Sequence, residues 1–337
     1  MTATKIFTRF LPIILGSSLF LGAAQAQDCN GIDRPIVFAG LDWNSAQVSN
    51  AIVRYILEQG FACTTDDIPG STVPMVQGLV RGDIDVNMEI WRNTAPETYY
   101  EAVETGDVLD LGLSMSAAEL SFLVPRYMVE GDPERGIEAT APGLRSVSDL
   151  VEHAELFRDP EEPNKGRYYN CIIGWQCELV NNAKLATYGL EESFTNFKPG
   201  TGPALAFSLA AAYEKGEPWL GYYWGPTWVL GEYDMIALEE PEYSDACWEG
   251  DQGCAFPVSI VHVAVSKEFA EAASQEMFDL LEAYSIDGDL MSGLLAFMQA
   301  NDVEAAEAAL EFLQSRTDLW TTWVSDEVAE RVLASLN

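Results

Sequence analysis

Apolar runs of strand length alternate with helical patterns through the first third of the chain. Strand-like runs occupy residues 35–39, 61–67 and 84–91, and apolar residues at helical spacing fill residues 45–59. Segments rich in glycine, serine and proline separate these elements, as turns do. This order predicts a parallel sheet whose loops gather at the carboxyl ends of its strands. In open α/β sheets of this kind, ligands bind at that edge.

A second group of elements begins with the strand-like run 120–125. Residues 219–224 and 235–238 are predicted to be further strands, with a helix over residues 204–213. The run 259–265 (SIVHVAV) predicts one more strand, after which the pattern is helical to the end of the chain. We therefore expect the chain to leave a first unit, build a second one and return to the first.

These segments predict an α/β protein of two lobes, each a mixed sheet flanked by helices, joined by a hinge of two crossings. We expect the crossings near residues 116–120 and 255–260. Lobe one would then hold residues 27–118 and 258–337, and lobe two residues 119–257. A chain of 337 residues is long enough for two such domains.

The first 26 residues have the features of a secretory signal. Lys5 and Arg9 precede a mostly apolar run at residues 10–21, and Ala24-Gln25-Ala26 forms a small-x-small cleavage pattern. A membrane anchor is the alternative, but the run is shorter than the roughly 18–20 residues that span a bilayer. We therefore expect residues 1–26 to be a signal peptide that exports the protein to the periplasm.

The charge of the chain excludes some partners. There are 53 acidic residues against 18 basic ones, a formal net charge of −35. Such a charge repels phosphate backbones and anionic lipid headgroups. It argues against nucleic acid and anionic membranes as partners, and otherwise indicates a well solvated surface.

Six cysteines lie outside the expected signal, an even number that suits an oxidising compartment. Two pairs are close in sequence and a third remains by elimination, which gives Cys171 with Cys177, Cys247 with Cys254, and Cys29 with Cys63. Other connectivities stay open. A zinc site is the competing interpretation, but the chain has only two histidines and no CxxC pair. Three disulfides are therefore favoured.

Nine tryptophans are present, and four of them fall where the predicted strands end: Trp43, Trp91, Trp175 and Trp224. Any one of these rings can simply fill a core. Four of them in loops at the expected ligand-binding edge indicate a binding site instead. The face of an indole is negative and attracts a cation. A methylated onium group, which has no N–H to donate, is held well by several such rings, and an aromatic cage is the solution that proteins use for it.

Four segments of the chain match one known pattern. They are the loop 170–178 (NCIIGWQCE) and the runs 82–91 (GDIDVNMEIW), 216–228 (GEPWLGYYWGPTW) and 256–262 (FPVSIVH). Together they resemble the periplasmic glycine betaine/proline betaine-binding proteins of osmoprotectant ABC importers. The likeness extends over nearly the whole chain after the signal.

This resemblance implies a two-lobed periplasmic binding protein of type II. Such a protein is not an enzyme and carries no cofactor or metal. Its partners would be a small methylated amine or onium ligand and an ABC permease in the inner membrane, and we expect it to be a monomer.

In that family three tryptophans form the cage, which implies this role for Trp91, Trp175 and Trp224. The resemblance also implies a disulfide between the two cysteines that flank Trp175. Backbone amides after that tryptophan hold the ligand carboxylate in the family, which maps to Gln176 and Cys177. Free N–H groups at a helix start favour an anion, which agrees with this assignment.

The sequence departs from the family pattern near its first cage tryptophan. The family has a carboxylate-binding histidine four residues beyond it, where this chain has Ala95. Glu89 precedes Trp91 by two residues on a strand, so both are expected to point to one face. Glu119, at the first crossing, is expected to look into the cleft. Trp43 has no counterpart in the family's cage and would add a fourth wall.

These departures suit a cation that has no carboxylate. Trimethylamine N-oxide and choline therefore join glycine betaine, proline betaine and a sulfonium such as dimethylsulfoniopropionate as ligands to be considered. The alternative interpretation is that both glutamates bond locally, to backbone or to Arg92 or Arg126.

Two other functions are less consistent with the sequence. A secreted hydrolase is disfavoured because no Gly-x-Ser-x-Gly elbow, HExxH motif or P-loop is present. A structural calcium ion in the acidic segment 239–251 is the other, but its spacing does not fit an EF-hand loop. We expect that segment to be a solvated loop tied by a disulfide.

Overall fold

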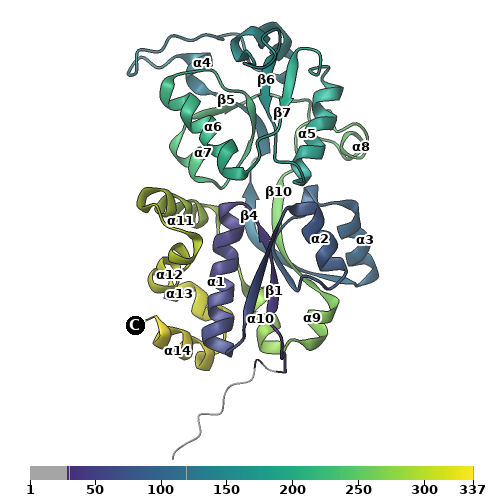
Figure 1. Ribbon diagram of the computed structural model, residues 1–337, viewed down its shortest axis with the longest axis vertical. Coiled ribbons are helices and arrows are strands. Elements are labelled where there is room, and N and C mark those ends of the chain that lie inside the picture. Colours follow the sequence, from purple (N-terminus) through teal and green to yellow (C-terminus); the bar gives the residue numbers. More distant parts are fainter. Residues whose placement is uncertain (1–28, 30, 119, 337) are drawn as a thin grey trace, which may run out of the picture.

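The computed structural model describes residue 29, residues 31–118 and residues 120–336 (Figure 1). Within these residues the chain forms two bodies stacked along the long axis, each built on a sheet of five strands. We call the body around the first sheet lobe one and the body around the second sheet lobe two. The expected signal at residues 1–26 lies outside the described residues, as does Glu119.

The sheet of lobe one has the order β2-β1-β3-β10-β4. Strand β1 runs parallel to β2 and β3, whereas β10 is antiparallel to both of its neighbours. The sheet is therefore mixed, and β10 is the predicted return of the chain. The strands are β1 (Ile36–Leu41), β2 (Thr65–Gly70), β3 (Val86–Trp91), β4 (Val108–Ala118) and β10 (Ser259–Ser266).

The sheet of lobe two has the order β7-β6-β8-β5-β9 and is mixed as well. Strand β6 is parallel to β7 and β8, while β5 is antiparallel to β8 and β9. The chain enters this lobe between β4 and β5 and leaves it between β9 and β10. The strands are β5 (Leu120–Pro125), β6 (Gly166–Tyr169), β7 (Phe194–Phe197), β8 (Gly221–Trp224) and β9 (Met235–Ala237).

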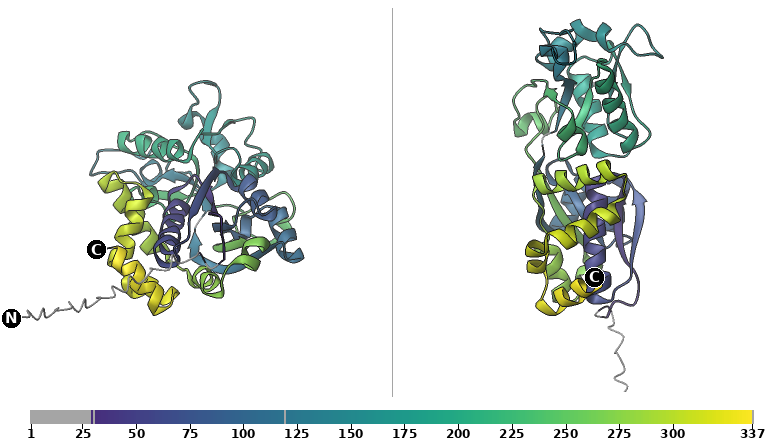
Figure 2. Two further views of the ribbon diagram at one scale, coloured as in Figure 1. Left: turned by 60° about the horizontal axis from the view of Figure 1, so that its bottom comes forward. Right: turned by 90° about the vertical axis from the view of Figure 1, so that its left-hand side faces the viewer.

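Helices cover both faces of the first sheet. Strand β1 shows how the faces differ, because Phe38 packs with α1 and the C-terminal helices while its neighbour Ala39 packs with α2 and α3. In Figure 2 the C-terminal helices lie beside α1, and α12 and α14 contact it. The helices are α1 (Asn44–Phe61), α2 (Thr72–Val80), α3 (Glu97–Thr105), α9 (Lys267–Ala272), α10 (Gln275–Ala283), α11 (Gly288–Asn301), α12 (Ala305–Ser315), α13 (Thr317–Trp320) and α14 (Asp326–Ser335), with 3-10 turns at Arg92–Thr94 and Thr321–Trp323.

Lobe two is also flanked by helices, of which α5 and α7 reach the boundary with lobe one. Helix α7 contacts α11 of lobe one, so the two lobes also touch away from the crossings. The helices are α4 (Arg126–Glu130), a 3-10 segment (Val147–Phe157), α5 (Gln176–Thr187), α6 (Gly202–Lys215), α7 (Trp228–Glu232) and α8 (Asp245–Trp248).

The strand expected at residues 61–67 begins four residues later than the pattern suggested. Helix α1 continues to Phe61, whose ring is buried, and ends at Ala62 in the left-handed conformation with its N–H bonded to the Leu57 carbonyl. The apolar run was therefore the last turn of a helix followed by a short loop, and the strand starts at Thr65.

All three expected disulfides are present. They join Cys29 to Cys63, Cys171 to Cys177 and Cys247 to Cys254. Across residues 31–118 and 120–336, no helix is both long and apolar enough to cross a membrane.

Candidate ligand-binding site

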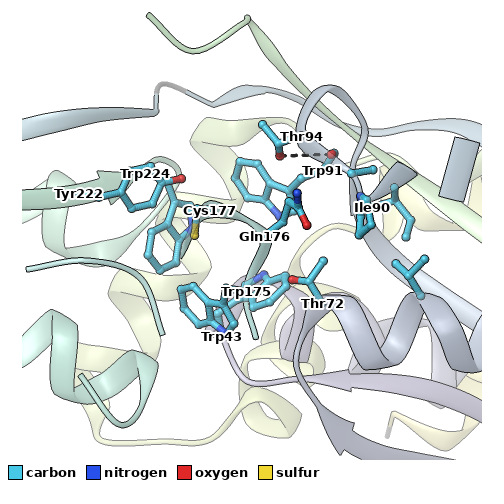
Figure 3. A pocket seen from close by; sticks show the side chains of 13 residues that line it. Trp43, Thr72, Ile90, Trp91, Thr94, Trp175, Gln176, Cys177, Tyr222 and Trp224 are labelled. Carbon is cyan, nitrogen blue, oxygen red and sulfur yellow. Dashed lines mark hydrogen bonds between the residues drawn. The ribbon is translucent and has the colours of Figure 1, made fainter. Parts of the chain in front are cut away.

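An apolar pocket lies where the two lobes meet (Figure 3). Trp43 follows β1, Trp91 ends β3 and Trp224 ends β8, so the pocket is at the strand ends where the sequence placed the ligand. Most of its lining surface is apolar. The lining residues are Trp43, Thr72, Val76, Ile90, Trp91, Thr94, Ala95, Pro96, Trp175, Gln176, Cys177, Tyr222 and Trp224.

Trp175 stands in the middle of a row of three indoles that joins the lobes. Its ring lies 5.2 Å from that of Trp43 at an interplanar angle of 74°. It lies 5.2 Å from the ring of Trp224 at an angle of 82°. Edge-to-face contacts are favourable for aromatic rings, and they turn successive indole faces in different directions. Rings arranged in this way can surround a small group, which rings stacked in parallel cannot do.

The edge of the Trp175 ring is fixed by a carboxylate of lobe one. The indole Nε1 donates a 2.6 Å hydrogen bond to Oδ1 of Asp42. Burial raises the pKa of Asp42, and the bond from Trp175 lowers it in part. The bond therefore spans the boundary between the lobes.

Trp43 is held in the same way by Glu89. Its Nε1 donates a 2.6 Å hydrogen bond to Oε2 of Glu89, which also accepts a 3.2 Å bond from the Ser45 hydroxyl. Glu89 is 3% exposed, and burial raises its pKa to about 7 although the donors on Trp43, Ser45 and Trp91 offset part of the rise. Its second oxygen, Oε1, has no hydrogen-bond partner in the described chain.

The loop that carries Trp175 is braced from within and from the other lobe. The Cys171–Cys177 disulfide closes it, and Trp175 is the residue just before α5. Gly174 has a φ of +96°, and a Cβ there would lie 2.3 Å from the Ser71 hydroxyl of lobe one. The Gly174 carbonyl accepts a 3.2 Å bond from the Val73 N–H. The loop thus fits against the start of α2.

The structure brings together most of the residues that the sequence singled out. Trp43, Trp91, Trp175 and Trp224 line the pocket, together with Gln176 and Cys177 at the start of α5. Figure 3 shows these side chains converging from both lobes.

The two glutamates singled out from the sequence are not among the pocket-lining residues that the structure describes. Glu89 does not line the pocket but lies behind Trp43, and Glu119 is outside the described residues. The local partners expected in the alternative interpretation are engaged elsewhere, since Arg92 bonds Asp110 and Arg126 bonds Asp234 and Glu130.

Sequence reasoning missed Asp42 and Tyr222. Tyr222 precedes Trp224 by two residues on β8, and that spacing places both on one face, so the strand period was an available signal. Asp42 is next to Trp43, but its partner is 133 residues away in sequence, and no local pattern indicates that bond.

The acidic segment 239–251 contains a buried ion pair. Nζ of Lys184, which is fully buried, lies 2.6 Å from Oε1 of Glu240, and Tyr188 donates a 2.7 Å bond to the same oxygen. The expectation of a wholly solvated loop was therefore wrong at Glu240, because α5 supplies a cation beneath it. No group of three or more His, Cys, Asp or Glu side chains in the described chain is arranged to hold a metal ion.

Comparison with known proteins identifies the family. The profile of the OpuAC family, the substrate-binding domain of the ABC-type glycine betaine transport system, matches residues 34–315. The chain belongs to this family. It is a substrate-binding receptor of an ABC transport system and not an enzyme.

Two curated relatives show what this receptor is similar to. It is 21% identical to the trimethylamine N-oxide-binding protein of Pelagibacter ubique over 324 residues, 94% of this chain and 98% of that protein. It is 24% identical to the glycine betaine/proline betaine-binding periplasmic protein of Escherichia coli over 189 residues, 52% of this chain and 57% of that one.

Solved structures confirm the fold of the receptor. A glycine betaine/L-proline-binding protein from Borrelia burgdorferi superposes with a TM-score of 0.72 at 20% identity, covering 89% of this chain and all of that one. A choline-binding protein in complex with choline superposes with a TM-score of 0.73 at 16% identity, covering 90% and 98%. The two mixed sheets flanked by helices are therefore those of a periplasmic binding protein, as expected.

Proposed function

We propose that this receptor captures a small methylated onium solute, of the glycine betaine class or trimethylamine N-oxide, in the pocket between its lobes. It then delivers the solute to the permease of an ABC importer in the inner membrane. The observation that carries the proposal is the row of indoles in which Trp175 contacts Trp43 of lobe one and Trp224 of lobe two.

The chemistry of the pocket suits such a ligand. Methylated ammonium has a positive charge spread over apolar methyl groups, so it needs apolar contact and negative electrostatic potential together. Indole faces supply both, at roughly 0.5–2 kcal/mol for each desolvated ring. Four tryptophans line the pocket, and none of its described lining residues is an arginine or a lysine.

The start of α5 provides for the polar end of the solute. The backbone N–H groups of the first turn have no acceptor within the helix and attract a carboxylate or an N-oxide oxygen. Gln176 and Cys177 occupy that turn and line the pocket. The side-chain oxygen of Gln176 is buried without a hydrogen-bond partner, which leaves the amide free to bind a hydroxyl or a water molecule beside the ligand.

Capture works by closure of the two lobes in this proposal. Lobe one consists of residues 27–118 and 258–337 and lobe two of residues 119–257, hinged at the two crossings. Trp43 and Trp91 belong to lobe one, while Trp175 and Trp224 belong to lobe two. A ligand that touches all four rings stabilises the closed form, which the permease can distinguish from the open one.

A ligand panel measured by calorimetry tests the proposal. The panel is glycine betaine, proline betaine, choline, dimethylsulfoniopropionate and trimethylamine N-oxide. Similarity to the Pelagibacter ubique protein over 94% of the chain favours trimethylamine N-oxide. Choline or a sulfonium as the best ligand would support the same cage with a different solute. Absence of binding to all five would refute the proposal.

Substitution of the central ring tests the site itself. Trp175→Ala is expected to weaken binding of the best ligand at least tenfold, because it removes a cage wall and opens a gap between two others. Trp248→Ala is the matched control, since Trp248 is a half-buried indole in α8 that does not line the pocket. Equal affinities for the two variants would show that the pocket is not the binding site.

Export to the periplasm as a monomer completes the proposal. The relatives include periplasmic binding proteins, and three disulfides suit an oxidising compartment. Mass spectrometry of the protein purified from the periplasm should show Gln27 as the first residue. A mature chain that retains residues 1–26 would contradict the cleavage site.

A further inference from the structure

Two of the pocket tryptophans donate their indole N–H groups to carboxylates, of which Glu89 is buried and Asp42 is partly buried. Trp175 bonds Asp42 and Trp43 bonds Glu89, and both N···O distances are 2.6 Å. A carboxylate bonded to a single indole is explained by local packing alone. The same arrangement on two contacting rings, one following β1 and one preceding α5, indicates a shared role.

Neither carboxylate is compensated by a cation of the protein. Among the ion pairs of the described chain, none includes Asp42 or Glu89. The buried carboxylates of Asp85, Asp159 and Glu240, in contrast, each pair with an arginine or a lysine. Buried charges are costly unless they are paired. One oxygen of Glu89 accepts no hydrogen bond from the part of the chain that the structure describes. Two carboxyl groups therefore lie behind rings of an apolar pocket whose described lining contains no lysine or arginine.

We propose that Asp42 and Glu89 act through the indoles of Trp175 and Trp43 to make the pocket select a cationic head group over a neutral group of the same shape. They are positioning residues in the sense that they act on the ligand through the rings. This inference rests on the proposed function, because it assumes that the ligand lies against those rings.

The physical basis is electrostatic. A hydrogen bond to a carboxylate draws the indole proton away and leaves more electron density on the ring, which strengthens its attraction for a cation. The carboxylate also contributes its own field, which reaches farther than the ring quadrupole and is weakly screened in a dry site. Both effects act on a charge and vanish for a neutral ligand. Apolar contact with the methyl groups, in contrast, is the same for both.

Paired ligands separate these two contributions. Choline and 3,3-dimethylbutan-1-ol have the same shape, as do glycine betaine and 3,3-dimethylbutanoate, and trimethylamine N-oxide and tert-butanol. In each pair a carbon atom replaces the charged nitrogen. The affinity ratio within a pair, measured by calorimetry, is therefore the charge selectivity of the pocket.

The variants Asp42→Asn and Glu89→Gln remove one charge each and keep an oxygen that can accept the indole N–H. Each should weaken binding of the onium member about tenfold and change binding of the neutral member less than about twofold, at a pH near 8 where Glu89 is ionised. Asp67→Asn is the control: it removes a half-buried charge from β2 that is bonded to Arg54 and to no indole. It should leave the ratio unchanged.

The pH profile provides a second readout that a purely structural role would not give. Onium affinity of the wild type should rise between about pH 6 and pH 8 as Glu89 ionises, and Glu89→Gln should remove that rise. Among the described residues, Tyr284 is a titratable group that interacts with Glu89, and Asp42 is bonded to Trp175, the ring that contacts Trp43. Burial raises the pKa of Tyr284 so that it stays neutral throughout. His262, on the neighbouring strand, bonds Asp110. It is present in both the wild type and Glu89→Gln, so the comparison between them cancels its contribution.

Each outcome decides the matter. If a variant loses the same affinity for the onium and the neutral member of a pair, the carboxylates only hold the rings in place. If the affinity ratio within a pair is unchanged, the charge of the carboxylates is irrelevant. Either result overturns the inference and leaves the proposed function standing. A wild-type protein that binds no onium compound overturns both. Selective loss of onium binding, with the melting temperature of the variants close to that of the wild type, supports the inference.

Discussion

The hydrogen bond from Trp175 to Asp42 joins the two lobes of the protein beside the pocket between them. It is 2.6 Å long, and its partners come from the loop before α5 and the end of β1. Beside it, the Val73 N–H of lobe one donates to the Gly174 carbonyl of lobe two. A ring that lines the pocket therefore also ties the two lobes together, so we expect ligand binding and lobe closure to depend on the same side chain.

Removing the acceptor should loosen closure. Asp42→Ala eliminates the bond to Trp175, and a hydrogen bond to a charged group contributes roughly 1.5–3 kcal/mol. We expect ligand affinity to fall by about tenfold or more and small-angle X-ray scattering to show a larger radius of gyration for the unliganded protein. Asp42→Asn keeps an acceptor and should retain the compact form. Identical scattering from the alanine variant and the wild type would contradict this role.

A methyl group at Gly174 should also hinder closure. Alanine there has an unfavourable left-handed backbone, at roughly 1–2 kcal/mol, and its Cβ would lie 2.3 Å from the Ser71 hydroxyl across the boundary. We expect Gly174→Ala to weaken binding at least tenfold.

Two further variants check the cause of that effect. Gly143→Ala, where an added Cβ meets nothing within 4 Å, should bind as the wild type does. Adding Ser71→Gly to Gly174→Ala should restore part of the affinity, because it removes the clash but not the backbone strain. A double variant as weak as the single one would place the whole effect in the backbone.

Glu89 should make the stability of the unliganded protein fall as pH rises. Burial raises its pKa from 4.5 to about 7, so between these values the folded protein binds more protons than the unfolded chain. Stability then decreases as pH rises through that window, by up to about 3 kcal/mol. Urea unfolding of the wild type and of Glu89→Gln should show the difference between them change with pH in this sense. A constant difference would mean that Glu89 titrates normally.

Lys184 should be needed for stability only because the Glu240 carboxylate is buried beside it. Lys184→Met leaves an unpaired buried carboxylate, and breaking such a pair costs about 3–5 kcal/mol. Combining it with Glu240→Gln should recover most of the lost stability in a denaturation experiment. If the double variant is as unstable as the single one, then the packing of the lysine chain, and not its charge, is what matters.

The Cys171–Cys177 disulfide should affect binding more than stability. It closes a short loop, so its removal is expected to cost about 2 kcal/mol of stability. The loop also carries Trp175, and its freedom should lower ligand affinity several-fold more than loss of Cys247–Cys254 does. Paired Cys→Ser variants, compared by calorimetry and by thermal unfolding, test this. If loss of either disulfide lowers the affinity equally, then the Cys171–Cys177 disulfide does not brace the loop for binding.

Much of this protein follows from its sequence alone. The alternation of apolar runs gave the two α/β units and the return of the chain at β10, because burial and the periods of helix and strand are local properties. Cysteine spacing predicted all three disulfides. Strand ends located Trp43, Trp91 and Trp224 at one pocket, since parallel strands present their carboxyl ends at one edge.

Only the tertiary structure decided what the acidic residues do. Glu89 lies behind Trp43 instead of facing the pocket, Asp42 meets an indole 133 residues away, and Glu240 is buried on Lys184. Sequence shows that a carboxylate is present but not its neighbours, because those come from elements packed together over long separations. The tryptophans that line the pocket were therefore predictable from their positions, whereas the carboxylates bonded to two of them were not.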